Sequence, residues 1–195
     1  MTRADKILKD VYKKLGISDK SDVVKYENLD KIIQLLQAIN NASPINPKTT
    51  GTITERLCEL AIRSEMGGDY SRMPGEWQWL ADYSLYGVPF NVIVSVKSFK
   101  VKERLMASGS GSLLTPTIAW TLADDYREFG ESRTRSYVYA GFIAIYMPAK
   151  TLVKVSSDAR KVMNVNGKPL LRDVSDFIKD MSSAKNHNRI DIRKY

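Results

Sequence analysis

The sequence predicts a mixed α/β fold in which helices flank a central β-sheet. Two observations support this prediction: apolar spacing alternates between helical and strand-like along the chain, and the segments follow the order helix, hairpin, helix, strand, helix. Apolar residues make up 43% of the 195 residues, which is enough for a hydrophobic core. This length favours one domain, with N-terminal helices (1–50), a catalytic core (51–150) and a C-terminal helical and basic appendage (151–195).

The N-terminal region contains two segments with helical periodicity. In residues 3–15 and again in residues 27–40, apolar side chains recur every three or four positions. Both are predicted to be packing helices, and their lysines are interpreted as a solvated face more than as a DNA contact. Residues 40–51 contain two prolines and several Asn residues, so they are predicted to form a loop.

The core begins with a helix and a hairpin. Residues 52–66 have helical spacing and are followed by two glycines. Residues 80–85 and 90–99 have the composition of strands, and Gly87 and Pro89 between them favour a hairpin. Alternation along the second strand places two sets of side chains on opposite faces: Val92, Val94 and Val96 on one, and Asn91, Ile93, Ser95 and Lys97 on the other.

The second half of the chain is less regular. We interpret residues 118–129 as a helix. Residues 135–148 are aromatic and β-branched, which is typical of a central strand that ends at Pro148. Residues 170–181 have the spacing of an amphipathic helix, and a basic tail follows.

The composition limits the chemistry. One cysteine, Cys58, excludes an internal disulfide, and with one histidine, His187, the chain cannot form an ordinary structural zinc site. We expect His187 to lie in a solvated tail, which also argues against catalysis by a serine or cysteine assisted by histidine. Any metal would therefore be held by oxygen ligands, which points to magnesium, manganese or calcium.

The charge indicates the kind of partner. The formal net charge of +8 favours an anionic partner such as nucleic acid. The longest nearly uncharged apolar run, residues 137–149, is shorter than the ~20 residues that cross a bilayer. The first residues carry charges where a secretory signal would be apolar. We therefore expect a soluble, cytoplasmic protein with no membrane partner.

One constellation in the core is suited to catalysis. Glu55 lies early in the first core helix, Asp82 opens the hairpin, and Lys97 lies near the end of its second strand. Two carboxylates and an ammonium on neighbouring elements can hold a divalent cation and activate a water, which is one way to hydrolyse a phosphodiester bond. The alternative is that Lys97 forms an ordinary salt bridge at a solvated strand end.

Cations and small hydroxyl donors indicate where DNA phosphates would bind. Residues 98–117 combine both, although this stretch is alternatively a flexible surface loop. The Tyr and Trp residues of 77–86 are interpreted as core residues more than as base-stacking platforms. The candidate DNA-binding residues are Lys48, Thr49, Thr50, Lys100, Lys102, Arg104, Ser108, Ser110, Arg133 and Arg135.

The catalytic constellation resembles that of the PD-(D/E)XK nuclease superfamily, which includes type II restriction endonucleases and Holliday-junction resolvases. Asp82 stands where that pattern has its aspartate, and residues 95–97 stand where it has the D/E-x-K tripeptide. Residues 51–56 are similar to the helix start that carries a further glutamate. The sequence departs from the pattern at Ala81, where proline is usual, and at Ser95, where an acid is usual.

The resemblance implies a restriction-endonuclease-like core and a role for each residue. Asp82 would be the main metal ligand, with Glu55 completing the acidic shell and the Val96 carbonyl as a further ligand. Lys97 would position or deprotonate the attacking water. Ser95 replaces a carboxylate, so the missing charge is either supplied by Glu55 or lost. The metal would be Mg²⁺, with Mn²⁺ as a substitute, whereas Ca²⁺ would bind without supporting cleavage.

The resemblance favours a type II restriction endonuclease of a restriction-modification system. Such an enzyme would be a homodimer that cuts a short palindromic sequence in double-stranded DNA. One alternative is a structure-specific nuclease such as a Holliday-junction resolvase, although the terminal helices make this chain longer than resolvases tend to be. Another is a basic DNA-binding protein without catalysis, which the serine at position 95 favours.

Overall fold

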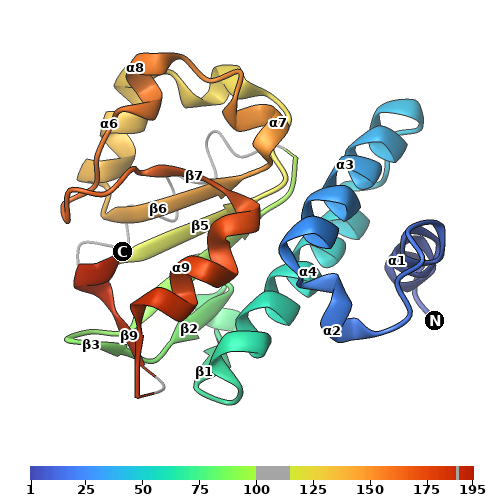
Figure 1. Ribbon diagram of the computed structural model, residues 1–195, viewed down its shortest axis with the longest axis horizontal. Helices are drawn as coiled ribbons and strands as arrows, with labels where there is room; N and C mark the ends of the chain where they lie inside the picture. Colours follow the sequence, from blue (N-terminus) through green and yellow to red (C-terminus); the bar gives the residue numbers. More distant parts are fainter. Residues whose placement is uncertain (100–114, 188) are drawn as a thin grey trace.

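The computed structural model describes residues 1–99, 115–187 and 189–195 (Figure 1). It confirms the predicted mixed α/β class, because a six-stranded mixed sheet is flanked by helices. The strand order in this sheet is β1-β2-β4-β5-β6-β7. The strands are β1 (Tyr70–Arg72), β2 (Tyr83–Leu85), β4 (Val92–Lys97), β5 (Thr117–Thr121), β6 (Phe142–Met147) and β7 (Leu171–Asp173).

Helices cover both faces of this sheet. The α-helices are α1 (Arg3–Lys14), α2 (Lys20–Val23), α3 (Tyr26–Ala42), α4 (Pro47–Met66), α6 (Glu131–Tyr139), α7 (Ala149–Leu152), α8 (Ser157–Arg160) and α9 (Phe177–Ala184). The 3-10 helices are η1 (Gly75–Trp77), η2 (Tyr126–Phe129), η3 (Val174–Asp176) and η4 (Ile192–Lys194). Within the described residues, none of the helices is both long and apolar enough to cross a membrane.

The N-terminal helices agree with the sequence. α1 begins at a capping box, in which Thr2 and Asp5 satisfy each other's backbone groups, and α3 follows the expected apolar period. α4, however, begins at Pro47, so the prediction of a loop through residue 51 is wrong. The Asn46 side chain accepts the Lys48 N–H at 2.9 Å, and proline suits the first helical position.

The hairpin prediction is confirmed. β2 and β4 pair antiparallel, with Tyr83 opposite Val94. β4, β5, β6 and β7 then run parallel to one another. β1 adds an antiparallel edge strand to β2, in a segment for which the sequence analysis expected no strand.

In the second half, one predicted element is wrong and another begins too early. Residues 117–121 form the strand β5 and not a helix; all five side chains are buried, and a short, fully buried run has no period that separates the two structures. Residues 135–139 belong to α6, and the strand is limited to 142–147. Thr134 and Tyr137 are buried three residues apart, which is the helical period.

The C-terminal helix is also shorter than expected. Residues 171–173 form β7, and α9 covers only 177–184. Between them the Asp173 carboxylate accepts the Ser175 N–H at 2.9 Å, which caps η3.

The last residues of the chain are packed, whereas His187 earlier in the tail is exposed, as expected. Tyr195 is 1% exposed. A small second sheet joins the tail to the hairpin, in the order β3 (Gly87–Val88), β9 (Arg189–Asp191) and β8 (Lys185–Asn186).

The core consists of two layers, one on each face of the main sheet. Valines of β4 and Trp120 of β5 pack with α1, α3, α4 and α9 on one face. Ala119 and Ile145 pack with α6 and α8 on the other. Figure 1 shows α1–α4 grouped on one side and α6, α7 and α8 together on another.

A charged network joins α9 to the sheet. Arg172 of β7 donates to the Asp180 carboxylate at 2.7 Å, and the Tyr146 hydroxyl of β6 donates to the same oxygen at 2.6 Å. The Arg172 side chain is only 12% exposed, so most of its charge lies out of water. The pair therefore belongs to the class in which losing one partner is costly.

We expect Asp180→Ala to lower the free energy of unfolding by about 2–4 kcal/mol, because Arg172 would remain buried without its partner. Arg135→Ala is the control: it removes an exposed pair with Glu131 and should cost about 0.5 kcal/mol or less. Urea unfolding of both variants measures the difference. Equal losses of stability would contradict this account.

Candidate active site

The candidate site lies where β4 ends. Asp82 immediately precedes β2, and β4 ends at Lys97, beside Thr121 of the neighbouring strand β5. Because β4, β5 and β6 are parallel, this is the edge of the sheet that carries their carboxyl ends, where ligands bind in open α/β sheets. The predicted position of the site is therefore a favourable one.

A hydrogen bond fixes the Asp82 carboxylate. Its Oδ2 accepts the backbone N–H of Val96 at 2.6 Å, while the Asp82 N–H donates to the Val94 carbonyl at 2.9 Å. The backbone ladder between β2 and β4 extends only to Tyr83 and Val94. The Asp82 side chain thus provides the next partner for β4 and is held against the strand that carries Lys97.

Ser95 and Lys97 alternate with the valines that face α4. Ser95 is 0% exposed and Lys97 only 9%. A largely buried ammonium needs an anionic partner. At this end of the sheet, the charges of Asp82 and Lys97 both act on the Glu55 carboxyl. The alternative of a solvated strand end is not supported by this burial.

Glu55 approaches from α4. Its backbone carbonyl accepts the Tyr83 hydroxyl at 3.2 Å, which ties this turn of the helix to β2. Burial raises the pKa of the half-buried Glu55 carboxyl, and the negative charge of Asp82 raises it further. Arg72 and Lys97 act in the opposite direction. The structure therefore brings Glu55, Asp82 and Lys97 into one electrostatic group.

Arg72 is a residue that sequence reasoning missed. It projects from β1, donates to Glu59 at 2.6 Å and lies 3.4 Å from the Tyr83 hydroxyl. This hydrogen bond lowers the pKa of Glu59. Glu59, one turn beyond Glu55 on α4, is thus engaged by Arg72, whereas Glu55 is the carboxyl whose pKa is raised by burial and by the charge of Asp82. The signal in the sequence that could have indicated β1 is the alternation of side-chain types in residues 70–72.

The donor set suits a small hard cation. Across the described part of the chain, no three His, Cys, Asp or Glu side chains are clustered for metal binding. Mg²⁺ commonly uses one or two protein carboxylates and fills its other positions with water and substrate phosphate. The Glu55 carboxyl, whose pKa is raised by burial and by the charge of Asp82, and the Asp82 carboxylate beside Val96 fit that requirement.

The predicted DNA-binding residues lie in different parts of the molecule. Lys48 and Thr49 are in the first turn of α4, but Thr50 is buried and its hydroxyl donates to the Pro47 carbonyl at 2.9 Å. Five of the predicted residues lie outside the described part of the chain: Lys100, Lys102, Arg104, Ser108 and Ser110.

The two arginines of α6 have partners within their own segment. Arg135 pairs with Glu131 at 2.8 Å, and Arg133 donates to the Glu128 carbonyl at 3.3 Å. α6 precedes β6 and so leads to the amino end of that strand, opposite the edge that carries Lys97. Each arginine therefore already has a partner that is close to it in the sequence.

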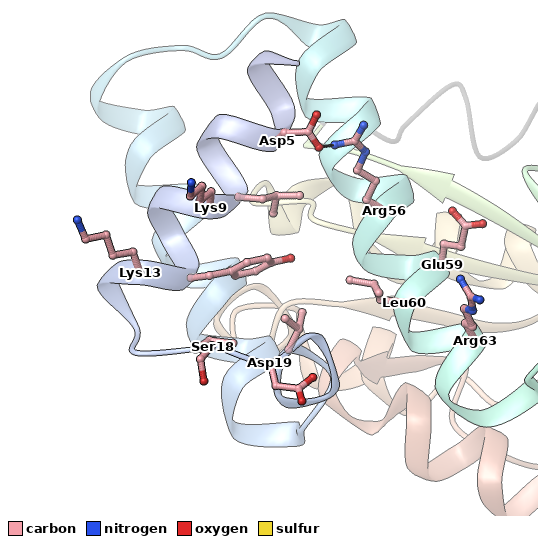
Figure 2. Close-up of a pocket in the computed structure, with 13 residues that line it drawn as sticks. Asp5, Lys9, Lys13, Ser18, Asp19, Arg56, Glu59, Leu60 and Arg63 are labelled. Atoms are coloured by element: carbon pink, nitrogen blue, oxygen red, sulfur yellow. Dashed lines mark hydrogen bonds and ion pairs between the residues drawn. The ribbon is translucent and has the colours of Figure 1, made fainter. Parts of the chain in front are cut away.

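A separate cleft of about 750 Å³ lies between α1 and α4 (Figure 2). Asp5 and Arg56 meet as an ion pair across it, and Lys13 points away from α4. Its lining includes Glu59 and Arg63 but none of Glu55, Asp82 or Lys97. The cleft is therefore distinct from the candidate site.

The Asp82–Val96 hydrogen bond can be tested without any assay of function. Asp82→Ala leaves the buried Val96 N–H without this acceptor, and we expect faster amide exchange there and a loss of about 1–3 kcal/mol in unfolding free energy. Asp82→Asn retains an acceptor oxygen and should lose less. The Ile145 amide, which donates to Leu170 at 2.8 Å, is the internal reference. Unchanged exchange at Val96 in the alanine variant would refute the geometry.

Comparisons with known proteins bear on the fold. No family model and no curated protein matches this sequence. A solved structure of the restriction endonuclease PspGI in complex with substrate DNA aligns with it over 92% of both chains, with a TM-score of 0.54 and 12% sequence identity. This protein therefore has a restriction-endonuclease-like α/β fold, as the sequence predicted.

Proposed function

We propose that this protein is a nuclease that hydrolyses phosphodiester bonds in double-stranded DNA. The observation that carries the proposal is the meeting of Asp82, Lys97 and Glu55 at the carboxyl edge of a restriction-endonuclease-like sheet. The net charge of +8 and the DNA in the PspGI complex support an anionic polymer as the substrate.

Each residue of the proposed site has a distinct role. Asp82 and Glu55, with the Val96 carbonyl, would hold Mg²⁺ or Mn²⁺, whereas Ca²⁺ would bind without supporting cleavage. The metal would supply Lewis-acid stabilisation of the charge that develops on the phosphate. Lys97, largely buried at the end of β4, positions the attacking water as an ammonium, and it can take a proton from that water only in its neutral amine form.

The finer proposal is a type II restriction endonuclease. Cutting both strands of a palindromic site requires two active sites related by two-fold symmetry, which a homodimer provides. A basic DNA-binding protein without catalysis is the second candidate. Ser95 favours it, because this position carries no acid to add to the two carboxylates of the site.

Cleavage of mixed-sequence plasmid or phage DNA tests the proposal. We expect discrete fragments with Mg²⁺ and none with EDTA. Asp82→Asn and Lys97→Met should each slow cleavage roughly 100- to 10,000-fold while DNA binding remains, because they remove catalytic groups and leave the surface intact. Asparagine is chosen because it keeps an acceptor for Val96.

Two other outcomes would change the interpretation. Cutting of branched DNA alone would assign the same chemistry to a structure-specific nuclease. DNA binding without cleavage of either substrate would favour the non-catalytic protein.

A matched pair of variants tests the role of Glu55. Glu55→Gln should lower the cleavage rate roughly 10- to 100-fold and raise the Mg²⁺ concentration required, because it removes one of two carboxylates of the metal shell. Glu59→Gln, one helical turn away, affects the pair with Arg72 and should change neither quantity as much. Titration of Mg²⁺ with both variants measures the contrast. Equal effects would remove Glu55 from the metal shell.

A further inference from the structure

Two of the three tryptophans lie on the surface, contrary to the expectation that they are core residues. Trp77 is 49% exposed and Trp79 is 61% exposed, whereas Trp120 of β5 is fully buried. Large aromatic rings are normally used to fill a core or an interface, so two exposed indoles in one short segment indicate a surface that contacts something.

The segment that carries these rings has a well-defined backbone. The Met73 N–H donates to the Asp82 carbonyl at 2.9 Å and closes the loop at its base. Within the loop, the Trp77 carbonyl accepts the Leu80 N–H at 2.9 Å, and Ala81 is fully buried. The loop is anchored at both ends, and the side chains of Trp77 and Trp79 are exposed to solvent. Their exposure is therefore a property of the fold.

The rings are also close to the candidate site along the chain. Trp79 lies three positions before Asp82, and an extended chain of that length spans at most about 11 Å. Trp77 is only two residues further. The rings are therefore within reach of a polymer whose phosphate binds at Asp82 and Lys97.

The chemistry of an indole defines what it would contact on DNA. Its flat apolar face stacks on the face of a nucleobase, but the interior of a regular duplex covers those faces with neighbouring bases. A tryptophan can stack only where a base step is opened, as it is around aromatic and aliphatic side chains that wedge into DNA. The basic charge of the chain favours DNA as the occupant over an apolar protein surface.

We infer that Trp77 and Trp79 stack on bases of the substrate beside the bond that is cut, so that the protein acts on DNA with a locally unstacked step. This inference rests on the proposed function and specifies the form of DNA that the site takes. Trp77 and Trp79 are positioning residues, because they hold the substrate and do not touch the reacting atoms.

Intrinsic fluorescence tests the contact, since only two of the three indoles are accessible. DNA is added in Ca²⁺ without Mg²⁺, as a fluorescein-labelled duplex that the protein cuts, or a mixed-sequence duplex if none is cut. We expect saturating DNA to quench tryptophan emission in the natural protein. The double variant Trp77→Phe, Trp79→Phe retains only Trp120 and should show no quenching.

Affinity gives a second readout. Trp77→Ala and Trp79→Ala should each weaken binding about 5- to 150-fold, measured by fluorescein anisotropy. Tyr139→Ala is the matched control, because Tyr139 is 84% exposed but precedes the amino end of β6, away from the site. In the same duplex, 2-aminopurine next to the cut bond should brighten on binding, and less so with the alanine variants.

The outcomes separate the inference from the proposed function. Saturated anisotropy with unchanged tryptophan emission overturns the inference and leaves the nuclease proposal standing. Emission that changes with protein concentration in the absence of DNA also overturns it, and assigns the rings to contact with a second copy of the chain. If neither duplex binds at any protein concentration, both the inference and the proposed function fail.

Discussion

The hydrogen bond from the Val96 N–H to the Asp82 carboxylate is the interaction on which the candidate site depends. At 2.6 Å it joins the point where β2 begins to the strand that presents Ser95 and Lys97. A carboxylate that accepts a backbone N–H is held in place by the sheet itself, without a flexible partner. The site thereby takes its geometry from the pairing of β2 with β4, the most rigid kind of support a fold offers.

The charges at this end of the sheet interact with one another because they are partly buried. Lys97 is 9% exposed and Glu55 is half-buried, so neither charge is fully solvated. Burial raises the pKa of Glu55, Asp82 raises it further and Lys97 lowers it, so the protonation of Glu55 depends on both neighbouring charges. A cluster of partly buried charges is more stable when its negative charges are offset by positive ones. A bound cation would offset the carboxylates further. The Arg72–Glu59 pair next to it balances its own charge.

The sequence predicted the elements that carry the site better than the rest of the fold. Helix α4 and the hairpin have local signals: apolar periodicity, a glycine-containing turn and alternation through Val92–Val96. Residues 117–121 have no such signal, since a buried apolar strand and a buried helix look alike. The Asp82–Val96 bond could not be predicted because it depends on where the backbone ladder ends. The exposure of Trp77 likewise depends on a loop closed by tertiary contacts.

The serine at position 95 is understandable from its surroundings. Ser95 is fully buried in the centre of β4, where an ionised carboxylate would carry a large desolvation cost unless a cation neutralised it. Glu55 is half-buried on a helix, so an ionised carboxylate has a smaller desolvation cost there. Its charge still interacts with Asp82 and Lys97. In the proposed enzyme the second acid is thus supplied by α4 and not by the strand. A site arranged in this way tolerates the absence of its metal better than one with two acids buried on adjacent strands.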